Sequence, residues 1–259
     1  MIPGQDAALP PLTRRLLGWE IIIVFAVSLG GSALNAVISL IGSLTAHKEL
    51  RHQAAVLVGS AAPGRPLLDL SFQLAGITLT LAPVALVFYL MARAGEPLSA
   101  MGLDTSQPGR DLARGTGLAA VIGGLGLGLY LAAYRLGISL NVVPESLPPV
   151  WWRVPVLVLI AFQNGVLEEI LVLGYLLRRL EQLGWRPGWA IAVSALLRGS
   201  YHLYQGFGGF IGNAALGVVF AVLFRRWRRV TPMIIAHGLI DTGAFLGYLA
   251  LHGRVAWLP

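Results

Sequence analysis

The sequence contains no cysteine and few charged residues, and both absences restrict what the protein can be. Without cysteine the chain can form no disulfide framework, no thiolate metal site and no cysteine nucleophile. Charged residues make up only 12% of the chain, which is about half the usual share in a soluble domain. Hydrophobic residues make up 56% of it. The composition therefore indicates a membrane protein.

Two familiar hydrolase motifs are also missing. No H-E-x-x-H occurs, so the usual helical zinc site of metalloproteases is absent. No G-x-S-x-G surrounds Ser200, which disfavours a serine nucleophile on a strained elbow. The run GGLGLG at 123–128 lies inside an apolar segment, without a preceding strand, and indicates helix packing instead of a nucleotide loop. Carboxylate and imidazole groups remain as the candidates for chemistry.

What the chain does contain is a series of long apolar runs. A helix needs about 20 mostly apolar residues to cross roughly 30 Å of hydrocarbon. We therefore predict an all-α fold, a polytopic transmembrane helical bundle. Residues 1–149 would supply N-terminal transmembrane helices, and residues 150–259 would form the core helices. About seven spans are expected, near 18–44, 67–91, 115–136, 150–183, 188–204, 211–224 and 232–251.

The fourth of these segments is unusually long and carries Gln163-Asn164-Gly165 in its middle. A straight helix over 150–183 would measure about 45–50 Å. We therefore expect this segment to bend or break near Asn164-Gly165, which membrane proteins tolerate where protein or a water cavity surrounds the break. The polar stretch 46–66 is expected to hold a short interfacial helix.

Basic residues predict the orientation, because lysine and arginine are enriched in cytoplasmic segments. With the N-terminus inside, twelve arginines lie on the cytoplasmic side and six basic residues on the other, while Arg198 lies within the fifth segment. The prediction is a multi-pass protein of a bacterial plasma membrane with a cytoplasmic N-terminus and a retained first span. The net charge of +7 is then a topology signal, and no nucleic-acid partner is expected. The twelve are Arg14, Arg15, Arg93, Arg110, Arg114, Arg178, Arg179, Arg186, Arg225, Arg226, Arg228 and Arg229.

Several ionisable residues fall inside the predicted spans, where a charge costs about 2.5–3.5 kcal/mol at the bilayer centre. His237 and Asp241 are four residues apart and share one helix face, and so do Arg198 and His202. Neighbouring glutamates point about 100° apart on a helix, so only one of the pair can aim squarely into a central site. The residues concerned are Glu168, Glu169, Arg198, His202, His237 and Asp241.

These groups suit hydrolysis of an amide inside a membrane. A buried carboxylate can take a proton from water, a histidine can relay it, and both groups can ligate zinc. Each residue taken alone also has a structural interpretation, because a single buried histidine can simply bond across helices. Arg198 is expected to be structural, since guanidinium stays charged. Tyr201 and Tyr204 are expected to pack, and Gln163 and Asn164 to stabilise the helix break.

Three segments resemble the CAAX proteases and bacteriocin-processing enzymes, the CPBP or Abi family. They are EEILVLGYLLRRLEQLG from residue 168, SYHLYQGFGGFIGNAALGVVFAVLFRR from residue 200 and IIAHGLID from residue 234. The family pattern is E-E-x-x-x-R, then F-x-x-x-H, then H-x-x-x-N or a similar polar residue. The resemblance covers roughly residues 150–251, and the first 140 residues match only in being hydrophobic spans.

The resemblance implies an intramembrane endopeptidase that acts on a peptide or a protein terminus. Glu168 would activate water with His202 as its partner, His237 and Asp241 would hold the oxyanion, and Glu169 fills the second glutamate position. The family has been described both as metalloproteases and as metal-independent enzymes. Zinc or another divalent metal is therefore left open, and Glu168, His202, His237 and Asp241 would be its ligands.

The sequence departs from the family pattern at Leu173, Arg198 and Asp241, where the family has arginine, phenylalanine and asparagine. We hypothesise that Arg198 supplies the cation lost at Leu173 and pairs with Glu169. The alternative is a catalytically degenerate scaffold or immunity-type protein that binds a partner in the same cavity. A proton-coupled transporter is disfavoured, because the chain contains no inverted repeat. Neither a prenylated substrate nor an oligomeric state is predicted.

Overall fold

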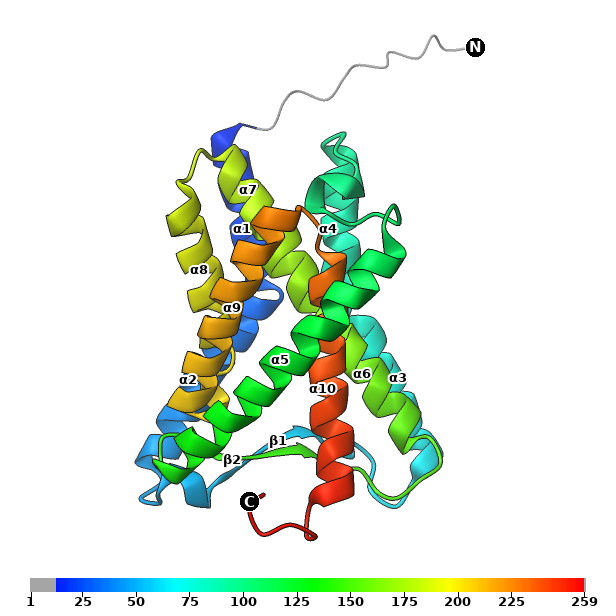
Figure 1. Cartoon of the computed structure of the whole chain (residues 1–259), viewed down its shortest axis with the longest axis vertical. Helices are drawn as coiled ribbons and strands as arrows, with labels where there is room; N and C mark the ends of the chain where they lie inside the picture. Colours follow the sequence, from blue (N-terminus) through cyan, green and yellow to red (C-terminus); the bar gives the residue numbers. More distant parts are fainter. Residues whose placement is uncertain (1–12, 259) are drawn as a thin grey trace.

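The computed structural model describes residues 13–258 and shows a bundle of helices with a small two-stranded sheet at one end (Figure 1). The residues ahead of the first span, 1–12, lie outside the described part. The helices are α1 Arg14–Ala26, α2 Leu29–Thr45, α3 Pro66–Thr80, α4 Ala82–Arg93, α5 Pro108–Arg135, α6 Arg153–Glu168, the π-helix η3 Glu169–Tyr175, α7 Leu176–Gln182, α8 Pro187–Ser200, α9 Phe207–Trp227 and α10 Thr231–Leu251. Strands β1 Ala54–Val58 and β2 Asn141–Glu145 and the 3₁₀ turns η1 Leu50–His52, η2 Leu98–Met101 and η4 Leu203–Gln205 complete it.

The protein is an integral membrane protein with five or six spans. Five helical segments of the described chain are long and apolar enough to cross a membrane, and the pair α1–α2, bent by 51°, makes a sixth if it counts as one span. The predicted number of seven spans is wrong, because the predicted span 188–204 corresponds to the short helix α8. That helix has 14 residues, which is about 21 Å, too short for roughly 30 Å of hydrocarbon. It packs beside α9 as the short arm of a hairpin.

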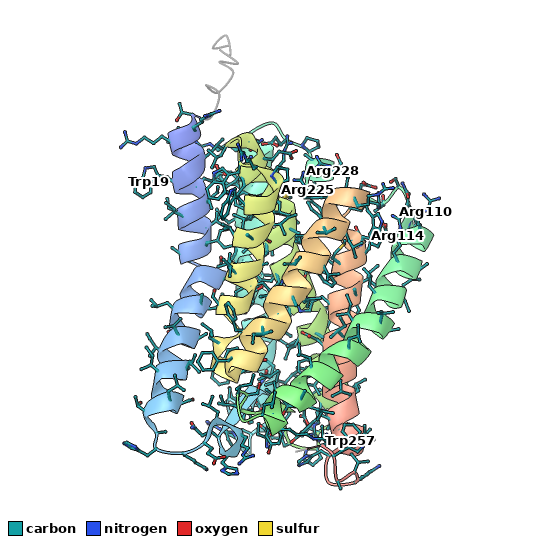
Figure 2. The ribbon with its side chains drawn as sticks, turned by 60° about the vertical axis from the view of Figure 1, so that its left-hand side comes forward. Trp19, Arg110, Arg114, Arg225, Arg228 and Trp257 are labelled. Carbon is teal, nitrogen blue, oxygen red and sulfur yellow. The ribbon has the colours of Figure 1, made fainter. Side chains whose placement is uncertain are left out.

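The two ends of the bundle differ in charge. Arg110, Arg114, Arg225 and Arg228 gather at one end, which we call the basic end (Figure 2). The two strands and Trp257 lie at the other, which we call the strand end (Figures 1 and 2). The start of α1 lies at the basic end and the end of α10 lies at the strand end (Figure 1). Any orientation in the membrane therefore puts these two points on opposite sides.

The segment α6–η3–α7 is the central helix of the bundle. Within its most apolar window 67% of the residues are buried, against 6% for α5. The predicted break at Asn164-Gly165 is wrong, because α6 continues without interruption to Glu168. The irregularity lies one turn later, where η3 adopts π-helical geometry. Such a turn accommodates an extra residue and is frequent at functional sites.

Gly165 is needed for close packing of α6 against α10. A Cβ atom on Gly165 would lie 2.9 Å from the carbonyl oxygen of Ile234, and one on Gly238 would lie 2.6 Å from the Phe162 ring. The two helices therefore approach each other at positions where neither can carry a side chain. This contact, and not a helix break, explains the glycine in the middle of the fourth segment.

We predict that Gly165→Ala destabilises the protein by about 1–3 kcal/mol, because the methyl group would push α6 and α10 apart. The matched control is Gly117→Ala on α5, where a Cβ atom meets no atom within 4 Å. That variant should be neutral or gain up to about 1 kcal/mol from helix propensity. Thermal unfolding in detergent measures both. Equal melting temperatures for the two variants would contradict the packing role of Gly165.

The sheet pairs β1 and β2 in parallel, with Ala54 opposite Asn141 and Val58 opposite Glu145. The expected interfacial helix in 46–66 is therefore largely wrong, because only the short η1 turn precedes the strand. The sequence AAVLV pairs with a segment far away in the chain, and local pattern does not reveal such a partner. Glu145 accepts a charge-assisted hydrogen bond from Arg153 and so ties β2 to the start of α6.

A buried ion cluster joins α1, α7 and the loop after α4 near the basic end. Arg179 is fully buried, lies 2.8 Å from Glu20 and also bonds Glu96. Burial alone would raise the pKa of Glu96, but hydrogen bonds from Gln182, Arg178 and Arg179 outweigh it and lower the pKa. The cluster fastens these elements together on that side of the bundle.

A second cluster fastens the loop before α10 to the start of α5. The Arg229 guanidinium donates to Asp111 at 2.6 Å and to Asp104 at 2.8 Å. Hydrogen bonds from the hydroxyl and the N–H of Ser106, together with Arg229, lower the pKa of Asp104 to about 2. The Asp104 carboxylate therefore stays ionised against Arg229 at ordinary pH.

Candidate functional site

A cavity of about 870 Å³ lies inside the bundle, between α5, α6, α9 and α10. Most of its wall is apolar or glycine, while several ionisable and polar side chains face it at the junction of α6, α8 and α10. These side chains come from three parts of the chain, about 35 residues apart, and the packing of three helices brings them together. They are Asn164, Glu168, Tyr201, His202, His237 and Asp241.

Glu168 is the last residue of α6, and its carboxylate is held from α8. The hydroxyl of Tyr201 donates a hydrogen bond to Oε2 of Glu168 at 2.6 Å. Nη1 of Arg198 lies 3.6 Å from the same oxygen. A phenol therefore orients the carboxylate, and a cation lies beside it. Tyr201 was predicted to pack only, and its position beside His202 was the available signal for a polar role.

Glu169 forms the fully buried centre of the cluster. Neither Glu169 nor Arg198 has an exposed side chain, and Nη2 of Arg198 lies 2.5 Å from Oε1 of Glu169. Nδ1 of His237 lies 2.6 Å from the same oxygen. The hypothesised pair of Arg198 with Glu169 is confirmed. Leu173, at the position where the family pattern has arginine, is fully buried.

His237 and Asp241 continue the chain of contacts toward the cavity. Nε2 of His237 lies 3.6 Å from Oδ2 of Asp241, one helical turn along α10. The amide of Asn164 donates to that same oxygen at 3.3 Å. The prediction that Asn164 stabilises a helix break is wrong, because it contacts α10 at the site. Its spacing of four residues from Glu168, which puts both on one face of α6, was the signal in the sequence.

His202 faces the cavity from the turn that follows α8. Its Nδ1 lies 3.0 Å from the carbonyl oxygen of Arg198. Because a carbonyl oxygen can only accept, we assign the proton to Nδ1, which leaves Nε2 as the nitrogen that can accept a proton in the neutral ring. The imidazole also packs against the Tyr201 ring, with centroids 4.8 Å apart. These contacts hold His202 on the cavity wall.

The spacing of three groups would allow a metal ion. Ligand atoms of Glu168, Glu169 and His237 lie within 4.8 Å of one another, which matches the three protein ligands of a catalytic zinc site. His202 and Asp241, two of the predicted ligands, are not in this group. Arg198 opposes a metal here, because its guanidinium already neutralises Glu169 at 2.5 Å and a divalent cation would meet that positive charge. We therefore derive no chemical step through a metal.

Comparison with known proteins gave one match. Residues 149–243 match the model of the Rce1-like family, described as type II CAAX prenyl endopeptidase Rce1-like. The matched stretch contains every ionisable residue of the cluster, from Glu168 to Asp241. The resemblance predicted from the three motifs is thereby confirmed for this part of the chain. The curated proteins and the solved structures gave no match.

Proposed function

Because residues 149–243 are Rce1-like, we propose that the protein is an intramembrane endopeptidase that hydrolyses a peptide bond with water. Glu168 would be the base, and His202, His237 and Asn164 would assist it. The substrate would be an extended peptide segment lying in the cavity. The proposed mechanism needs no metal ion.

The observation that carries the proposal is the position of Glu168. Its carboxylate borders the cavity within a transmembrane bundle, while Glu169 beside it is fully buried in an ion pair. Neighbouring glutamates thus have different tasks: Glu169 anchors Arg198 and His237, and Glu168 remains accessible to water. A bundle that needed only stability would have no reason to expose a charged carboxylate to a cavity at this depth.

The reaction would proceed through a bound water beside Glu168. The carboxylate takes one proton from the water, and the oxygen forms a bond to the carbonyl carbon of the substrate. The negative charge that develops on the carbonyl oxygen is stabilised by hydrogen bonds from the α6–α10 side of the cavity. The proton then passes to the amide nitrogen, directly or through Nε2 of His202. The C–N bond breaks, and a carboxylate and an amine leave.

Asn164 fits the role of oxyanion donor better than Asp241 does. An ionised aspartate would repel an oxyanion, and Asp241 stands where the family has asparagine. The Asn164 amide lies 3.3 Å from Asp241 and also borders the cavity. The amide that the family carries on α10 would therefore be supplied from α6. Asn164 would then be the second relocated side chain of the site, after Arg198.

We predict that Asn164→Ala lowers kcat by about 10²–10³-fold and leaves KM nearly unchanged, as loss of one oxyanion donor does. The matched control is Asn213→Ala. Asn213 borders the same cavity from α9, but its amide donates to the Gly209 carbonyl oxygen. Steady-state kinetics with a fluorogenic peptide measures both variants. A similar loss of kcat in the two variants would argue against a specific role for Asn164.

A second candidate is a membrane binding protein that uses the same cavity without catalysis. The observation that favours it is the neighbourhood of Glu168, since the Tyr201 hydroxyl and the Arg198 guanidinium both lie against one carboxylate oxygen. Both contacts occupy an oxygen that would otherwise be free to accept a proton from water. This candidate requires partner binding that survives the loss of the Glu168 charge.

The decisive experiment uses the purified full chain in detergent with a library of internally quenched peptides. Cleavage, with substoichiometric metal in the same sample and full activity in a chelator, is the expected result. Loss of cleavage in the chelator together with bound zinc would overturn the metal-free mechanism. A folded protein that cleaves no peptide in the library would favour the binding candidate.

A further inference from the structure

We infer that the cavity opens to the extracytoplasmic side of the membrane, so that its substrate is an extended, mostly apolar peptide presented from that side. The peptide substrate in this inference rests on the proposed function, whereas the side to which the cavity opens does not depend on it. It combines the direction of the cavity with the distribution of charge over the two ends of the bundle.

The cavity extends from the ionisable cluster toward the strand end. Its wall includes Leu57 of β1, Val142 and Pro144 of β2, and Trp257 beyond α10. Among residues 13–258, none in the basic-end connections 94–107, 183–186 and 228–230 borders it. A peptide therefore reaches Glu168 past the two strands, or laterally between helices in that half of the bundle.

The basic end is closed by the two ion clusters described above. Arg179 joins α7 to α1 and to the loop after α4, and Arg229 joins the α9–α10 connection to α5. Their side chains are almost completely buried. Opening a passage on this side would expose paired charges and break several charge-assisted hydrogen bonds.

Charge assigns the two ends to the two sides of the membrane. Twelve of the 19 basic residues belong to segments at the basic end, and six belong to segments at the strand end. The excess persists when the buried Arg179 and Arg229 are left out, since the other ten arginines of the basic end are not buried. The positive-inside rule places the end with more lysine and arginine in the cytoplasm. The strand end, where the cavity leads, is then extracytoplasmic.

The shape of the passage describes the peptide that would enter it. From Arg153 at the strand end to Glu168, α6 rises about 22 Å. An extended chain covers that distance in about seven residues. Most of the wall consists of glycines and aliphatic side chains, with fewer polar groups among them. A segment of a secreted or membrane-anchored protein, apolar over about seven residues, fits this path. The lipidated tail of a cytoplasmic protein would arrive at the closed end.

The absence of cysteine allows a clean test by single-cysteine labelling of the full chain in spheroplasts. Ala61→Cys lies in the exposed loop between β1 and α3, at the strand end. Thr105→Cys lies in the exposed loop before α5, at the basic end. Ala244→Cys borders the cavity on α10. The matched control Val121→Cys is 62% exposed on α5 but lies outside the cavity wall, where hydrocarbon would protect it. The reagent is a membrane-impermeant maleimide, and labelling in detergent gives the total for each variant.

We expect labelling from outside at residues 61 and 244, labelling at 105 only after the membrane is opened, and none at 121 before detergent. Labelling of 105 but not of 61 in intact spheroplasts would overturn the orientation. Labelling of 61 without 244 would overturn the open passage. These outcomes do not depend on catalysis, so an inactive protein that labels as expected would refute the proposed endopeptidase and leave the inferred access intact.

Discussion

Glu168→Gln should lower peptide cleavage by about 10²–10⁴-fold, the range that a positioned general base contributes. An amide has almost the shape of the carboxylate but cannot take a proton from water. Its carbonyl oxygen can still accept the hydrogen bond from Tyr201, which lies 2.6 Å from Oε2 in the wild type. Substrate binding should therefore change little, so that the loss appears in kcat. Steady-state kinetics with the best peptide from the library provides the measurement.

Glu49→Gln is the matched control for this variant. Among the described side chains, the exposed Glu49 forms a surface ion pair with Arg51 and a longer contact with His52. Such surface contacts contribute little to stability. The Glu49→Gln variant should cleave the peptide at the wild-type rate. Thermal unfolding of both variants distinguishes loss of chemistry from loss of fold. A Glu168→Gln protein that unfolds normally and retains more than about a tenth of the wild-type kcat cannot be using Glu168 as its base.

The sequence predicted the helical membrane bundle and the gathering of ionisable groups because both follow from simple rules. Apolar runs of sufficient length cross membranes, and charged side chains inside a membrane pair with one another. The Arg198–Glu169 pair could be predicted because one arginine is missing and another present at equivalent motif edges. That inference used the family pattern, since helical spacing alone does not relate residues on different helices.

Other features depended on tertiary contacts that no local pattern contains. The local pattern at Asn164 and Gly165 predicts a helix break, whereas Asn164 contacts Asp241 and Gly165 lets α10 approach. Tyr201 donates to Glu168 only because α8 ends at Ser200 and turns its following residues into the cavity. The stretch after Ser200 reads YHLYQG and is polar on balance, so the sequence already carried a signal that the apolar run ends near Ser200, and the span predicted for 188–204 extends past it.

Arg198→Met should be the most destabilising single change in the cluster, at about 3–5 kcal/mol. The variant removes the cation and leaves Glu169 in a fully buried position, with His237 as its one remaining partner among the described side chains. Methionine keeps most of the volume of the arginine side chain. The loss of stability would therefore come mainly from the lost charge and not from a new cavity. Arg226→Met, at an exposed arginine of the basic end, is the matched control and should unfold like the wild type.

A double-mutant cycle shows whether the effect belongs to the pair. Glu169→Gln combined with Arg198→Met should cost less than the two single changes added together, because neither variant group is then an unpaired buried charge. Additive costs would mean that Arg198 acts through its other neighbours, such as the Phe220 ring, which lies 5.6 Å from the guanidinium carbon. Melting temperatures in one detergent, with matched protein concentrations, provide the comparison.

The hypothesis that Arg198 replaces an arginine at residue 173 can be tested in the same protein. Arg198→Phe with Leu173→Arg restores the family arrangement, since residue 173 lies one helical turn beyond Glu169. This double variant should be more stable than Arg198→Phe alone, because the new guanidinium can reach the carboxylate that the first change leaves unpaired. If it is as unstable as the single variant, the cation at this site is not transferable between helices. Arg198 would then have to be explained by its contact with Glu168, at 3.6 Å, and not as a replacement for the family's arginine.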